Sequence, residues 1–149
     1  MPNIFDILRE EHVVMRALVQ RAEENTDKDS RKLLRDDLKL LLLPHAKGEE
    51  SALYPEMEKT ERLRLDALEA VDEHQLIDRA LETLEANLEG DDDEWKAAAQ
   101  VLRETVFHHL AEEEEKTFPE AEKAFDAARK EELAEVYRHA YNARAQELK

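Results

Sequence analysis

Apolar residues recur at three- and four-residue intervals along most of the chain, which is the spacing of amphipathic helices. Four such stripes cover about residues 3–22, 34–55, 63–88 and 95–119, with short polar breaks between them. Because short connections join antiparallel neighbours, the pattern predicts an all-α protein built on an up-and-down four-helix bundle. The chain is thus predicted to form a single domain over residues 1–149.

The chain after the fourth stripe predicts an additional C-terminal helix, at about residues 120–148, that packs across or beside the bundle in a structural role. Prolines mark two local conflicts with helical geometry. Pro44 lies inside the second stripe and predicts a kink just before His45, because proline lacks an amide donor and clashes with the preceding turn. Pro55 biases Tyr54 out of helical geometry, so the second helix is expected to end there.

Composition supports this fold and excludes several functions. The 149 residues include only 2 glycines and 4 prolines, which favours long helices with few turns. A net charge of −16 repels phosphate backbones and anionic lipid surfaces, so neither nucleic acid nor a membrane is an expected partner. The absence of cysteine excludes disulfides and thiolate metal sites. Without a signal pattern or an apolar run of about 20 residues, the expected location is cytoplasmic.

The chain contains the same helix pair twice. Each half has a Glu-His dipeptide on its first helix and a His-x-x-x-Glu-Glu string on its second. The repeated residues are Glu11-His12 and His45-x-x-x-Glu49-Glu50 in the first half, and Glu73-His74 and His109-x-x-x-Glu113-Glu114 in the second. Residues four apart on a helix project from one face, so each His-x-x-x-Glu pair can hold a metal ion.

Two carboxylates on the inner stripes strengthen this interpretation. Each histidine alone has an ordinary explanation as a hydrogen-bonded core residue. Glu49 and Glu113 are different, because an ionised carboxylate in the interior is costly unless a positive charge compensates it, and no lysine or arginine shares the inner positions. Metal ions bound by carboxylate and neutral imidazole together would supply that charge. The nitrogen and oxygen donors suit a di-iron or di-manganese centre, and zinc could also bind.

Over about residues 4–119, these motifs resemble the hemerythrin-like, or HHE cation-binding, family. The resemblance implies a four-helix bundle around two non-haem iron ions bridged by carboxylates and an oxo or hydroxo group, with manganese and zinc less favoured. It also implies the ligands. The terminal ligands would be His12, His45, His74 and His109, and the bridges would be Glu49 and Glu113.

One departure from the family affects the expected function. Oxygen-carrying hemerythrins have a second histidine one turn after the third-helix ligand, and Asp78 occupies that position here. Asp78 is therefore a candidate additional ligand, or the position is left to water or substrate. Either arrangement disfavours reversible oxygen transport.

The chain resembles instead the branch with the pattern His, His-x-x-x-Glu, His, His-x-x-x-Glu. Peroxide breakdown and nitric oxide reactions are known in that branch. We therefore expect a di-iron protein that reacts with dioxygen, hydrogen peroxide or nitric oxide, with catalase-like disproportionation as the first candidate activity. The alternatives are a sensor of oxygen, nitric oxide or iron, an iron-binding module without turnover, and a metal-free structural bundle.

The residues next to these candidate ligands have other expected roles. Glu50 and Glu114 should face sideways, either as solvated charges, the favoured interpretation, or to orient imidazole N–H groups. Tyr54 and Phe118 should plug the end of the bundle, with a redox or proton-donor role for Tyr54 as the minor alternative. His108 points away from the inner face and is interpreted as a surface residue.

Overall fold

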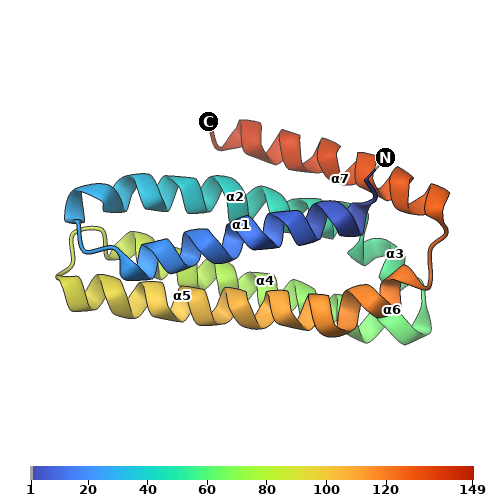
Figure 1. Ribbon diagram of the computed structural model, residues 1–149, viewed down its shortest axis with the longest axis horizontal. Helices are drawn as coiled ribbons and strands as arrows, with labels where there is room; N and C mark the ends of the chain where they lie inside the picture. The colour runs from blue at the N-terminus through green and yellow to red at the C-terminus, as the bar shows by residue number, and fades with distance from the viewer. Residues whose placement is uncertain (1) are drawn as a thin grey trace.

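Four long antiparallel helices enclose the core in the computed structural model, which describes residues 2–149 (Figure 1). The all-α class and the predicted bundle are confirmed. The long helices are α1 (Ile4–Glu24), α2 (Arg31–Ala52), α4 (Glu61–Ala86) and α5 (Asp92–Glu112). The shorter elements are η1 (Lys28–Ser30), α3 (Tyr54–Glu58), the π-helix η2 (Glu113–Thr117) and α6 (Phe118–Glu122). The C-terminal helix is α7 (Ala127–Glu147).

Capping side chains determine where several helices begin. Asn3 accepts a hydrogen bond from the N–H of Asp6 at the start of α1, and Asp6 accepts one from Asn3 in return. Asp91 and Glu94 form the same reciprocal box at the start of α5. Asp126 caps α7 with its carboxylate. These bonds satisfy amide groups that a helix start leaves without intrahelical partners.

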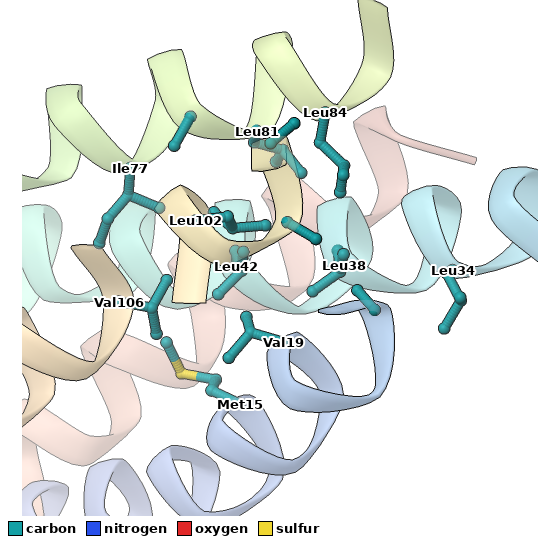
Figure 2. Close-up of a cluster of buried hydrophobic side chains, with 14 of the residues drawn as sticks. Met15, Val19, Leu34, Leu38, Leu42, Ile77, Leu81, Leu84, Leu102 and Val106 are labelled. Carbon is teal, nitrogen blue, oxygen red and sulfur yellow. The ribbon is translucent and has the colours of Figure 1, made fainter. Parts of the chain in front are cut away.

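The hydrophobic core consists of two clusters separated by a layer of histidines. Figure 2 shows the first cluster, in which side chains of α1, α2, α4 and α5 meet. The second cluster lies at the end of the bundle where α3, α6 and α7 close it, and it includes Phe5, Leu53, Leu63, Phe118 and Tyr137. Along α1, for example, His12 follows Leu8 of the second cluster and precedes Met15 of the first. The histidines are therefore held between two apolar layers.

The second helix ends close to Pro55, as predicted, since α2 ends at Ala52, but the predicted conformation of Tyr54 is wrong. Tyr54 is helical, because it begins the new helix α3 and Pro55 lies in the first turn. Proline is tolerated there, since the first amide groups of a helix need no intrahelical partner. Pro44 lies inside α2, which continues through it from Arg31 to Ala52.

The fourth helix also extends beyond the predicted end at Pro119. After α5, the chain makes the π-helix η2 and continues as α6 to Glu122. The N–H of Phe118 bonds to the carbonyl of Glu113, five residues earlier. A π-turn inserts an extra residue into a helix and is found often at functional sites.

The predicted C-terminal helix is confirmed as α7, which lies along α2 and the start of α1 (Figure 1). It buries Leu133, Ala134 and Tyr137. The ring of Tyr137 lies directly on the backbone of Gly48 in α2, where a Cβ atom would come within 2.3 Å of the ring. Only glycine permits this approach.

The outer faces of the helices carry charged residues joined in places by ion pairs, such as Arg35 with Glu85 at 2.7 Å. Within residues 2–149, none of the helices combines the length and the apolar character needed to cross a membrane.

Candidate metal centre

One layer in the middle of the bundle contains all six predicted ligands. Each of the four long helices contributes a histidine at this level, and α2 and η2 contribute the carboxylates. The residues are His12 on α1, His45 and Glu49 on α2, His74 on α4, His109 on α5, and Glu113 at the start of η2. All six are at most 4% exposed. The sequence repeat therefore converges on one buried site.

The ligand atoms form two groups that share one carboxylate. In each group, the candidate atoms all lie within 4.8 Å of one another. The first group contains His12, His45, Glu49 and Glu113, and the second contains Glu49, His74 and His109. Glu49 belongs to both, which is the arrangement expected of a carboxylate that bridges two ions.

The distances within the groups match those of ligands around a common ion. Two nitrogens at about 2.1 Å from a metal and at right angles to each other lie about 3.0 Å apart. His74 and His109 place their Nε2 atoms 3.1 Å apart. The Nε2 of His74 is 3.1 Å from Oε1 of Glu49, and that of His109 is 3.3 Å from Oε1 of Glu113.

Carboxylates hold the outward nitrogen of every imidazole. The Nδ1 contacts are His12 with Glu114 at 2.8 Å, His45 with Glu11 at 2.8 Å, His74 with Glu50 at 2.6 Å, and His109 with Glu73 at 2.7 Å. An ionised carboxylate can only accept a hydrogen bond, so each Nδ1 donates and the lone pair of each Nε2 points inward. Glu50 and Glu114 thus orient imidazoles and are more than solvated charges.

These four pairs form a closed ring around the bundle. Glu11 of α1 holds a histidine of α2, and Glu50 of α2 holds one of α4. Glu73 of α4 holds one of α5, and Glu114 of η2 returns to α1. The first three pairs each link one long helix to the following long helix, and the fourth links η2 back to α1.

Four inward atoms have no hydrogen-bond partner among the described residues. They are Nε2 of His12, Nε2 of His45, Oε2 of Glu49 and Oε1 of Glu113. Buried polar atoms are almost always satisfied, because an unsatisfied one costs free energy. Convergent lone pairs of imidazole and carboxylate also repel one another unless a cation lies between them. The residues therefore fit a metal site.

The electrostatics of the centre also indicate a need for positive charge. Burial by itself lowers the pKa of His45, but the carboxylates of Glu49 and Glu11 outweigh it and raise the pKa to about 10. Burial also lowers the pKa of His109, but the carboxylates of Glu113, Glu49 and Glu73 together raise it well above its usual value. Burial raises the pKa of Glu49, but the imidazoles hold it well below its usual range. Protons and metal ions compete for the same lone pairs.

A family comparison agrees with this geometry. The model of the hemerythrin HHE cation-binding domain matches residues 3–121. The chain belongs to the hemerythrin HHE family. No curated protein and no solved structure matches it. The hemerythrin match includes all six buried ligand candidates and ends before α7 begins at Ala127. The resemblance inferred from the sequence is confirmed, and a cation site at the histidine layer fits the family.

Tyr54 packs in the apolar cluster at the end of the bundle, as predicted, and its hydroxyl also reaches the buried carboxylates of the centre. Its hydroxyl donates to Oε2 of Glu113 at 2.7 Å and lies 3.0 Å from Oε1 of Glu49. Burial, together with these two carboxylates, raises the pKa of Tyr54 well above its usual value, so the hydroxyl keeps its proton. Phe118, its counterpart in the second repeat, stacks on His12 with ring centroids 5.5 Å apart.

Asp78 lies beside the centre and belongs to neither group of ligand atoms. It lines a cavity of about 10 Å³ that the imidazoles of His45, His74 and His109 also border. That volume is about the minimum that holds one water molecule. Burial raises the pKa of Asp78. Its assignment as an additional ligand stays a prediction.

The sequence reasoning missed three residues that contact the ligands. Glu11 and Glu73 were recognised as parts of the repeat, but they were given no function, although each holds a histidine of the next helix. Tyr137 donates a hydrogen bond to Glu11 and lies on α7, the helix for which the sequence predicts only a structural role. His108 is exposed, as predicted, and contacts Glu73 on its outer side.

Proposed function

We propose that this protein holds two iron ions and that the centre reacts with hydrogen peroxide, dioxygen or nitric oxide, with peroxide disproportionation as its activity. The observation that carries the proposal is the pair of ligand groups that share Glu49, one with four candidate residues and the other with three. His74 and His109 of the three-residue group border the cavity beside Asp78, and His45 of the four-residue group borders it as well. A small ligand could therefore bind the less saturated ion from that side.

Iron is the metal we favour. Imidazole and carboxylate donors suit iron, manganese and zinc, and the sequence has no thiolate donors. The ligand pattern of the chain resembles the di-iron branch of the hemerythrin family, and this resemblance favours iron over the other two metals. When bound, two iron ions would supply and take back the two electrons that convert two molecules of hydrogen peroxide into two of water and one of dioxygen.

The side chains of the chain would support this reaction in three ways. The ring of carboxylates holds the imidazoles in one tautomer, so the ligand atoms need little reorganisation. Met15, Leu42 and Ile77 make the cavity wall largely apolar and admit only a small ligand. Tyr54 presents a protonated hydroxyl to the centre, and Asp78 is placed at the cavity to exchange a proton with a bound ligand.

An oxygen electrode tests the proposed activity. Iron-loaded protein should evolve one dioxygen for every two peroxides consumed, and metal-free and zinc-loaded protein should not. His139→Ala is a matched control, because His139 is exposed on α7. If the iron-loaded protein evolves no dioxygen and its near-ultraviolet absorption does not respond to oxidant or nitric oxide, the proposal is wrong.

A sensor or binding module without turnover is the second candidate. It is favoured by the contact between α7, which lies outside the family match, and Glu11 beside the centre. Hydrogen exchange of residues 127–147 should then change when nitric oxide binds the iron-loaded protein, while peroxide is not consumed. An enzyme with a rigid α7 would show turnover and no such change.

A further inference from the structure

The carboxylate of Glu11 differs from the other three in the ring by its second partner. Glu114 pairs with the guanidinium of Arg16 at 2.9 Å, and the side chain of Glu50 is 38% exposed to solvent. Glu73 faces the exposed His108. Glu11 instead accepts a hydrogen bond from the hydroxyl of Tyr137, which comes from α7. One imidazole–carboxylate pair is therefore completed by a helix outside the four-helix bundle.

Tyr137 is held firmly against this pair. The residue is 1% exposed, and its hydroxyl oxygen lies 3.1 Å from Nδ1 of His45. Its ring stands edge-on to the imidazole of His45, with centroids 6.1 Å apart, and it lies on the backbone of Gly48. Glycine inside a helix is destabilising relative to alanine. The close approach of Tyr137 gives a physical reason for glycine at this position of α2.

We propose that Tyr137 is a positioning residue for His45. Through Glu11, it fixes the imidazole that serves the four-residue ligand group, and it thereby couples the docking of α7 to the occupancy of that metal position. The inference rests on the metal-binding part of the proposed function and not on any turnover. Because coupling between two equilibria is reciprocal, a bound ion strengthens the docking of α7 as much as docked α7 strengthens binding of the ion.

The geometry makes this coupling selective for one of the two metal positions. Tyr137 contacts both Glu11 and His45, and His45 belongs to the four-residue group. The imidazoles of the three-residue group are held instead by Glu50 and Glu73, which lie on α2 and α4. A change at Tyr137 should therefore weaken the binding of one ion and leave the binding of the other nearly unchanged.

Tyr137→Phe tests the inference, because it keeps the ring on Gly48 and removes only the hydroxyl. Tyr141→Phe is the matched control, since Tyr141 lies one turn later on α7 with its ring 5.9 Å from that of Tyr137. Metal-free protein is titrated with Co²⁺, whose absorption reports each binding step. Tyr137→Phe should lower the affinity for one of the two ions by about 10- to 100-fold, as is typical when the partner of a ligand is lost. Tyr141→Phe should titrate like the unmodified chain.

Unfolding by urea separates positioning from simple packing. If Tyr137 only packs, the Phe variant loses the same stability with and without Co²⁺, and the inference is overturned. If Tyr137 positions His45, the Phe variant loses more free energy of unfolding in the Co²⁺-loaded protein than in the metal-free protein. Metal loading should then increase the hydrogen-exchange protection of residues 127–147 in the unmodified chain but not in the variant.

The titration also distinguishes failure of the inference from failure of the proposed function. Two normal Co²⁺ affinities in Tyr137→Phe, or an equal weakening of both, would overturn the inference and leave the metal site intact. If the unmodified chain binds no Co²⁺, both the inference about Tyr137 and the proposed metal-binding function are overturned. Gly48→Ala is a second test variant, because its added Cβ would displace the ring of Tyr137. It should weaken the binding of the same one of the two Co²⁺ ions.

Discussion

Removing metal from the centre should lower the stability of the protein strongly. Four buried polar atoms at the site lack hydrogen-bond partners. Each such atom costs about 1–3 kcal/mol, so a cation that satisfies all four removes a penalty on the order of 4–12 kcal/mol. Protons on the imidazoles offset part of this penalty in the metal-free protein, since the pKa of His45 is raised to about 10. The lower end of the range is therefore expected.

Binding thermodynamics gives a similar magnitude. Two ions, each present at about 100 times its dissociation constant, stabilise the folded state by about 5 kcal/mol. For a domain of this size, each kcal/mol lost from the free energy of unfolding lowers the melting temperature by about 2–4 °C. Metal removal should therefore lower the melting temperature by on the order of 10–20 °C.

Circular dichroism melts of chelator-treated and iron-reloaded protein at one protein concentration measure the shift. His139→Ala should show the same shift as the unmodified chain, because His139 lies outside the centre. Equal melting temperatures with and without metal would refute the reasoning and favour a metal-free structural bundle.

Three further predictions follow from the site. His45→Ala or Glu113→Ala should reduce bound iron and the melting temperature together, as measured by elemental analysis and circular dichroism, whereas His139→Ala should change neither. Tyr54→Phe should retain two irons but slow the peroxide reaction by at least about tenfold, because a positioned proton donor is lost; an unchanged rate in the oxygen-electrode assay would exclude this role. The metal-free protein should lose stability as pH rises. The raised pKa of His45 means that its bound proton stabilises the folded state fully below about pH 6.5 and progressively less up to about pH 10, so urea unfolding at pH 6.5 and 9.5 should differ in that direction.

The sequence predicted the bundle and the six buried side chains because both follow from one periodicity. A histidine or glutamate on the inner stripe of a helix must face the core, whatever the rotation of the neighbouring helices. Glu49 and Glu113 were informative for the same reason, since they interrupt apolar stripes without a nearby cation. The helical periodicity of each segment was therefore enough to predict that these residues lie together in one layer.

The partners of the ligands were less predictable. Glu11 is adjacent to His12 in the sequence and yet holds His45, because the pairing depends on how α1 and α2 are rotated and staggered. Tyr54 enters the centre because the chain restarts as a new helix at this residue, which the proline rule did not anticipate. Tyr137 lies 92 residues from His45, and no short-range pattern connects them. The difference between Tyr54 and Phe118 in the repeat was the one available signal for a special role.

Metal stoichiometry combined with anomalous diffraction at the iron edge tests the central claim most directly. The account predicts two irons per chain, one within the group of His12, His45, Glu49 and Glu113 and the other beside His74 and His109. Less than one iron per chain after incubation with excess ferrous ion, or anomalous peaks away from the histidine layer, would contradict it.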